Sequence, residues 1–230
     1  MGFKLTINKN GVLEKAELVD ETGFVMPYSV RGVGEREFCD YSILTNVTIP
    51  DGVTSIGDGA FSGCDWLAGV EIPGSVLCIG DKAFYDCYSL ADITIPENVV
   101  VLGADAFADC NSLVSVTILG RVTCIGDRAF AWCELLTAIT IPDSVTSIGN
   151  RAFSSCSSLA SLRIPEEVLS IGSEAFSYCG LLTSVVIPES VTRIGEYAFA
   201  NCCEDLVISA PAGSYAERYA ASNGIKYTAI

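Results

Sequence analysis

Histidine is absent from this 230-residue sequence, and basic residues are few. Histidine is the commonest general base and a frequent metal ligand, so its absence argues against catalytic and metal sites. Lysine and arginine number 13 against 28 aspartates and glutamates, which gives a net charge of −15. Nucleic acids and anionic membrane surfaces attract basic proteins, so neither is expected as a partner. The simplest interpretation of the acidic charge is solubility, and a cationic partner or weak cation binding is the alternative.

Long apolar runs are also missing. No stretch approaches the ~20 apolar residues of a transmembrane helix, so membrane insertion is not expected. The N-terminal residues, Met1 to Lys4, do not have the pattern of a signal peptide. We therefore expect either an intracellular protein or a chain whose leader lies outside this sequence.

The sequence does contain a repeat with a period of 23 residues. All eight prolines follow this period, and Leu119 stands at the one position where a proline is missing. Such a period predicts a solenoid, in which stacked repeats share a continuous core. We expect an α/β solenoid in one continuous domain. Eight of the ten phenylalanines follow the same period: Phe38, Phe61, Phe84, Phe107, Phe130, Phe153, Phe176 and Phe199.

The first part of each repeat favours a β-strand. In one repeat, Leu136, Ile139 and Ile141 are spaced by three and two residues, and the pattern is rich in β-branched side chains. Stacked copies of this strand would form a parallel sheet with a spacing of about 4.8 Å. Pro142 ends the strand because proline has no N–H to donate, and a turn-like pair follows it.

The second part of each repeat predicts a corner and a short helix. Gly149 stands at a position that is glycine in all eight repeats, which indicates a positive φ or close backbone packing. Asn150 is a candidate helix cap. Ala152, Phe153 and Cys156 have a spacing that would turn them toward one interior on a helical turn.

Eleven cysteines first suggest disulfides or a metal site. None of the periodic cysteines has the paired C-x₂₋₄-C partner that a zinc site needs, so no metal and no cofactor are expected. Oxidative pairing between neighbouring repeats stays open, but a ladder of reduced, buried thiols beside the phenylalanines is simpler. Seven cysteines follow the period: Cys64, Cys87, Cys110, Cys133, Cys156, Cys179 and Cys202.

The two ends of a solenoid need caps, because their outer faces would otherwise expose the core. Asn10-Gly11 between apolar runs predicts a hairpin, so residues 1–22 are expected to form an N-terminal cap. Residues 23–211 hold the eight repeats. Residues 212–230 are expected to form a C-terminal cap, with a helix that begins after Ser214 and stops at Gly224, followed by a strand.

The unit L-x-x-V-x-I-P-x-x-V-x-x-I-G-x-x-A-F-x-x-C resembles the leucine-rich repeats of the BspA-like class, which includes Treponema pallidum-type proteins. The resemblance extends from about residue 23 to residue 211, and the tail SYAERYAASNGIKY is similar to the usual end of that family. It implies a curved, right-handed solenoid without catalytic residues. It also implies a cell-surface or secreted bacterial protein that adheres to host matrix proteins, host cells or other microbes. The absent leader departs from that pattern.

A partner would contact residues that the core does not explain. Tryptophan and tyrosine are enriched at binding hot spots, although these aromatic residues could instead fill gaps in the surface or cover a cap. Candidate contacts on the exposed strand face are Glu71, Asp92 and Arg163, and candidates among the aromatic residues are Trp66, Tyr85, Tyr88, Trp132 and Tyr178.

The sequence supports three hypotheses for function. The first is a non-catalytic adhesion module that binds a protein, or alternatively a glycan. The second is a structural spacer with no ligand of its own. An enzyme is the least supported, because histidine, a glycine-rich phosphate loop and a histidine-paired cysteine are all missing.

Overall fold

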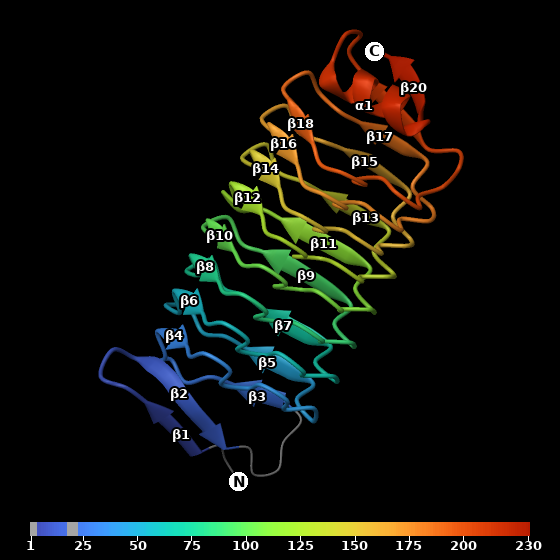
Figure 1. The fold of residues 1–230 in the computed structure, drawn as a ribbon. Helices are drawn as coiled ribbons and strands as arrows, with labels where there is room; N and C mark the ends of the chain where they lie inside the picture. Colours follow the sequence, from blue (N-terminus) through green and yellow to red (C-terminus); the bar gives the residue numbers. More distant parts are fainter. Residues whose placement is uncertain (1–3, 18–22) are drawn as a thin grey trace.

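Stacked turns of chain form an elongated β-solenoid, with the first and last described residues at opposite ends (Figure 1). The computed structural model describes residues 4–17 and 23–230. Each repeat contributes one strand to each of two parallel rows, and residues 23 positions apart are paired, as Val116 is with Ile139. The parallel solenoid is therefore confirmed, whereas the right-handed superhelical twist stays a prediction.

The first row holds the longer strands that precede the prolines. Their outward side chains are exposed and their inward side chains buried, which is the alternation that the sequence predicts. These strands are β3 (Gly23–Val25), β5 (Asn46–Thr48), β7 (Gly69–Glu71), β9 (Asp92–Ile95), β11 (Ser115–Ile118), β13 (Ala138–Thr140), β15 (Ser161–Arg163), β17 (Ser184–Val186) and β19 (Val207–Ala210).

The second row consists of two-residue strands that precede the glycine found at the same position of every repeat. Its pairing is interrupted between the fourth and fifth strands, at the repeat where Leu119 replaces proline. In the other repeats a valine N–H closes the turn onto the proline carbonyl, as Val145 does onto Pro142. The strands are β4 (Gly32–Val33), β6 (Ser55–Ile56), β8 (Cys78–Ile79), β10 (Val101–Leu102), β12 (Cys124–Ile125), β14 (Ser147–Ile148), β16 (Ser170–Ile171) and β18 (Arg193–Ile194).

The short helix predicted in each repeat is wrong. The segment from the glycine to the ladder cysteine, here called the turn segment, is a series of consecutive turns in every repeat. Its N–H groups alternate between two kinds of acceptor: Phe153 donates to Ala175 of the next repeat, whereas Ser154 donates to Arg151 of its own. A helix would direct all of these N–H groups along its own axis and leave none for the neighbouring repeat.

The candidate helix cap Asn150 has a different role for the same reason, and so has Asp127 at the same position of the preceding repeat. Asp127 Oδ1 accepts a hydrogen bond from the N–H of Asn150, and Asn150 Oδ1 accepts one from the N–H of Ser173, at 2.7 and 2.9 Å. Each side chain therefore binds the following repeat instead of starting a helix in its own.

The glycine before each turn segment is required by close packing. Gly149 does not have a positive φ. A Cβ atom added there would lie 2.7 Å from the backbone nitrogen of Asp127 and 2.7 Å from the carbonyl carbon of Gly126. Only glycine lets the two turns approach this closely.

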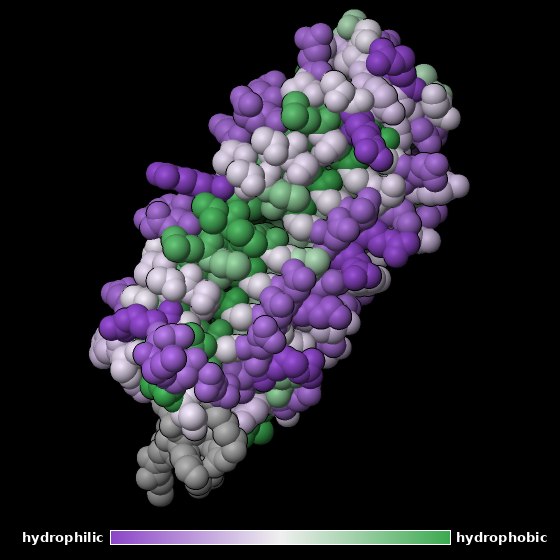
Figure 2. Space-filling view, turned by 60° about the vertical axis from the view of Figure 1, so that its left-hand side comes forward, coloured by the Kyte–Doolittle hydropathy of each residue, from purple (hydrophilic) through white to green (hydrophobic). Residues whose placement is uncertain are grey.

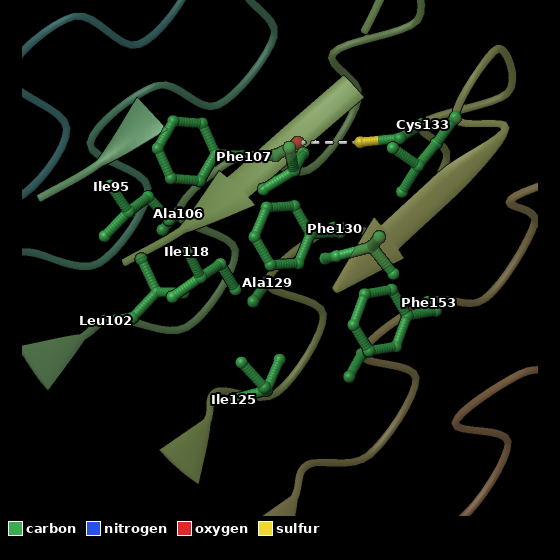
Figure 3. Close-up of a cluster of buried hydrophobic side chains, with 14 of the residues drawn as sticks. Ile95, Leu102, Ala106, Phe107, Ile118, Ile125, Ala129, Phe130, Cys133 and Phe153 are labelled. Atoms are coloured by element: carbon green, nitrogen blue, oxygen red, sulfur yellow. Dashed lines mark hydrogen bonds between the residues drawn. The ribbon is translucent and has the colours of Figure 1, made fainter. Parts of the chain in front are cut away.

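Phenylalanine and cysteine side chains form two parallel ladders in the core. Figure 3 shows Phe107, Phe130 and Phe153 of the first ladder and Cys133 of the second. Adjacent rings of the phenylalanine ladder, Phe38 to Phe199, are stacked with centroids 5.1–5.6 Å apart. Each thiol of the cysteine ladder, Cys64 to Cys202, donates to the phenylalanine carbonyl of the preceding repeat, as Cys133 does to Phe107 at 3.2 Å. All eleven cysteines are free thiols.

The ends of the array have their own elements. Strands β1 (Lys4–Ile7) and β2 (Val12–Glu17) form an antiparallel hairpin, and β2 pairs with β4. Helix α1 (Tyr215–Asn223) begins after Ser214, whose hydroxyl accepts from the N–H of Glu217, and ends at the left-handed Gly224. Strand β20 (Lys226–Ala229) then pairs with β19. We interpret these elements as terminal caps; residues 1–3 and 18–22 of the predicted N-terminal cap lie outside the described residues.

Candidate functional site

The turn segments form one long side of the solenoid, and most of the aromatic residues predicted to bind a partner lie there. Within residues 4–17 and 23–230, no group of three or more acidic or cysteine side chains could hold a metal ion. No helix in this part of the chain is long and apolar enough to cross a membrane.

Trp132 and Tyr178 border one hollow of about 310 Å³, here called the aromatic hollow. They occupy the same position of the repeat in two turns that are separated by a third, and Ser155 occupies that position in between. The exposed fractions are 38% for Trp132 and 56% for Tyr178. The small serine between two large rings leaves a depression in the surface.

The backbone at this position makes the two aromatic residues unusual. Trp132 and Tyr178 have φ angles of 58° and 60°. Left-handed backbone favours Gly, Asn and Asp and costs roughly 1–2 kcal/mol for other residues. Asp86 and Asp109 occupy this position in other repeats. Bulky aromatic residues thus stand where the turn alone would favour a small polar residue, and such outliers motivate a functional hypothesis.

An ion pair forms one wall of the aromatic hollow. The guanidinium of Arg151 lies 2.7 Å from the carboxylate of Glu174. The hydrogen bond between them lowers the pKa of Glu174 and raises the pKa of Arg151. Both groups therefore remain charged near neutral pH, and they give the hollow a polar rim beside its aromatic walls.

Tyr85 and Tyr88 lie in a second group, among carboxylates. The hydroxyl of Tyr85 hydrogen-bonds with Asp109, and the hydroxyl of Tyr88 with Asp86. Burial is the largest cause of the raised pKa of each carboxyl group. The charge of Asp86 raises the pKa of Asp109 further, whereas the hydrogen bond with Tyr88 partly lowers the pKa of Asp86. Trp66 lies in the preceding repeat and is 65% exposed. This part of the surface combines aromatic side chains with negative charge.

The charged candidates lie on a different face, the outer side of the first row of strands. Glu71 pairs in register with Thr48, and Asp92 with Ser115. Arg163 lies four repeats beyond Glu71 and forms an exposed ion pair with Glu166 at 3.0 Å. The structure therefore does not bring the charged candidates together with the aromatic ones, and it separates Glu71 from Arg163.

An apolar patch that was not predicted from the sequence lies on the second row of strands. Figure 2 shows apolar surface gathered near the middle of the array on the side that faces the viewer. Leu77, Val100 and Val101 lie in adjacent repeats of this row and are each nearly half exposed. Thr54 and Thr146 occupy the position of Leu77 and Val100 in other repeats, so this substitution was the signal in the sequence.

Comparison with known proteins identifies the repeats. A family model described as "BspA type Leucine rich repeat region" matches residues 20–135 and 79–207, with six copies. A search of curated proteins found no match.

Solved structures with the same architecture come from several bacteria. A leucine-rich repeat protein of T. pallidum is 27% identical, with a TM-score of 0.63, over 98% of this chain and 95% of that chain. One from Bacteroides ovatus is 23% identical, with a TM-score of 0.56, over 99% and 75% of the two chains. One from Eubacterium ventriosum is 23% identical, with a TM-score of 0.51, over 92% and 70%.

Proposed function

Because the chain belongs to the BspA-type leucine-rich repeat family, we propose that it is a non-catalytic protein-interaction module of a bacterial surface or secreted protein. The observation that carries this proposal is the aromatic hollow between Trp132 and Tyr178. The partner is a protein of a host matrix, a host cell or another microbe, and the activity is adhesion.

The aromatic hollow has the features of an interface centre. Aromatic residues supply most of the binding energy at many interfaces when a ring packs into a pocket and water is excluded. Here the pocket is formed by Ser155 between the two rings, with the Arg151–Glu174 ion pair at its edge. A partner that inserts an apolar or aromatic side chain would desolvate both rings and leave the ion pair at the rim.

Binding of the purified chain to a panel of host matrix proteins and microbial surface proteins tests the proposal. The test variant is Trp132→Ser with Tyr178→Ser, because serine is the natural residue at this position in the repeat between them. The control variant is Glu71→Thr with Arg163→Thr, which restores the residue of neighbouring repeats on the other face. We expect a saturable signal that the serine variant weakens at least tenfold, equivalent to about 1.4 kcal/mol, and the control retains.

A second aromatic region is tested in the same experiment. The variant Trp66→Ala, Tyr85→Ala, Tyr88→Ala removes the group beside Asp86 and Asp109. If only this variant loses binding, the partner contacts the surface around Trp66, Tyr85 and Tyr88, and the aromatic hollow is not the interface. If a folded protein binds nothing in the panel, the chain is better explained as a structural spacer.

A further inference from the structure

Three backbone N–H groups of each turn segment form hydrogen bonds with the next repeat, and the pattern holds without exception in the first seven repeats. In the seventh repeat the donors are Glu174, Phe176 and Tyr178. They donate to the carbonyl oxygens at positions 196, 198 and 200 of the eighth repeat. The N···O distances are 2.7–3.0 Å throughout. Every interior turn segment therefore binds peptide carbonyl groups at three fixed positions.

The eighth repeat has the same three donors but no repeat after it. They are the N–H groups of Tyr197, Phe199 and Asn201, and helix α1 packs over this end of the core instead. The hydroxyl of Tyr219 on α1 lies close to the backbone of Ala198 and Phe199. Among the residues that the structure describes, the N–H groups of Tyr197 and Asn201 form no hydrogen bond.

The residues that carry these two donors line a pocket. The pocket measures about 280 Å³ and lies between the eighth turn segment and α1, with Cys203, Glu204 and Asn223 also on its walls. Tyr197 is 64% exposed at its mouth, although its φ angle of 59° would again favour a small residue. A backbone N–H without an acceptor is costly when it is removed from water, so a ligand here gains most from supplying acceptors.

We propose that this pocket binds a short segment of main chain from a partner protein, whose carbonyl oxygens accept hydrogen bonds from the N–H groups of Tyr197 and Asn201. The interior repeats provide the template, since the same donors there always bind peptide carbonyls. Recognition of this kind extends an existing backbone hydrogen-bond pattern with an added segment. That the ligand belongs to a protein rests on the proposed function.

The ligand is an uncharged amide and not a carboxylate. Glu204 lines the pocket, Glu196 precedes the first donor, and the whole chain carries a net charge of −15. An anion would approach against this charge, whereas a peptide carbonyl offers the same acceptor without it. Side chains of the partner would contact the ring of Tyr197 at the mouth.

Amide NMR of the 230-residue chain tests the proposal with N-acetyl-Ala-Ala-N-methylamide as the probe. With two or three hydrogen bonds and little apolar burial, the dissociation constant should be on the order of 1 mM, so a titration to about 10 mM suffices. We expect saturable downfield shifts of the Tyr197 and Asn201 amide protons. Acetate at the same concentration should leave both unchanged.

Two variants locate the binding. Cys203→Phe places a ring at the pocket wall and should abolish both shifts. Ser157→Phe places the same ring at the equivalent, exposed position of an interior repeat and should leave the shifts as in the parent chain. The proposal is overturned if neither amide shifts, if the shifts persist in Cys203→Phe, or if acetate produces them.

Failure here is distinguishable from failure of the proposed function. Loss of partner binding in the Trp132→Ser, Tyr178→Ser variant depends on the aromatic hollow alone. Trp132 lies three repeats before the last repeat of the array, and Tyr178 lies one repeat before it. If that loss is observed and the peptide probe produces no shift, the interaction module stands and the end pocket is rejected.

Discussion

Replacing Phe130 by alanine removes the central part of the phenylalanine ladder. The ring is fully buried and is stacked between Phe107 at 5.6 Å and Phe153 at 5.5 Å. Truncation of a buried phenylalanine costs about 3–5 kcal/mol, because apolar contacts are lost and a cavity remains. Since a domain is typically stable by only about 5–15 kcal/mol, we expect a large decrease in the free energy of unfolding.

A phenylalanine at the end of the ladder provides a comparison for the cost of alanine substitution in its middle. Phe199 is stacked on one side only, on Phe176 at 5.3 Å, and its other side meets the edge of Tyr219. Stacked and edge-to-face ring pairs each contribute about 0.5–1.5 kcal/mol beyond buried area, so Phe199→Ala should cost within about 1 kcal/mol of Phe130→Ala. Phe130→Leu, which retains much of the volume, should cost roughly half as much as the alanine variant.

Urea unfolding followed by circular dichroism and tryptophan fluorescence measures these differences. In a repeat array the coupling between neighbours holds the two halves together, so a central defect can uncouple them. The two tryptophans, Trp66 and Trp132, lie in different repeats, and single-tryptophan variants would report such uncoupling as non-coincident transitions. A change below about 1 kcal/mol for Phe130→Ala would refute the role of the ladder as the main source of stability.

Three further perturbations test other parts of the structure. Gly149→Ala should destabilise the chain by about 1–3 kcal/mol in the same assay, because its Cβ would lie 2.7 Å from the backbone of the preceding turn; Gly180→Ala, with no atom within 4 Å of the added Cβ, is the control. Alkylation at pH 8 should label Cys124 rapidly in the native state and leave the six buried cysteines, Cys64 to Cys179 in the ladder, unlabelled until unfolding. Burial raises the pKa of Cys64 and Cys156 to about 12, so fast native labelling of these thiols would contradict their placement. Burial and the charge of Asp86 raise the pKa of Asp109, so the folded state binds its proton more tightly than the unfolded state, and stability should decrease as pH rises from about 3.9 through the raised value. Asp109→Asn should remove this pH dependence and stabilise the chain by less than about 1 kcal/mol at pH 7, and a destabilised variant would show that the hydrogen bond with Tyr85 outweighs the buried charge.

Sequence periodicity predicted the solenoid, the first row of strands and the two core ladders, because these depend on which side chains are buried. The spacing of Leu136, Ile139 and Ile141 predicts which face of a strand points inward, and this prediction does not require the position of the neighbouring repeats. It failed for the turn segment, where Ala152, Phe153 and Cys156 fit a helical spacing. The series of turns that forms instead is stabilised by N–H groups that donate to carbonyl groups of the next repeat. Hydrogen bonds between segments about 23 residues apart leave no local signal in the sequence.

The candidate site was predictable only in part, for a related reason. The off-period aromatic residues could be identified one by one, but the sequence could not show that Trp132 and Tyr178 border one hollow while Glu71 and Arg163 lie on another face. It also could not show which glycines pack closely and which, like Gly180, are free of contacts. These properties depend on the distance between repeats and on the direction of each turn.

The backbone hydrogen bonds between repeats explain several features that the sequence presents as separate. Glycine precedes each turn segment because its backbone lies against the backbone of the preceding repeat, and Asp127 or Asn150 adds a side-chain bond to the following repeat. The cysteine ladder also links adjacent repeats, since each thiol donates a hydrogen bond to the phenylalanine carbonyl of the preceding repeat inside the core. An array held together in this way cannot end without leaving donors behind. The end of the array, and not its regular interior, is therefore where a backbone-binding site is to be expected.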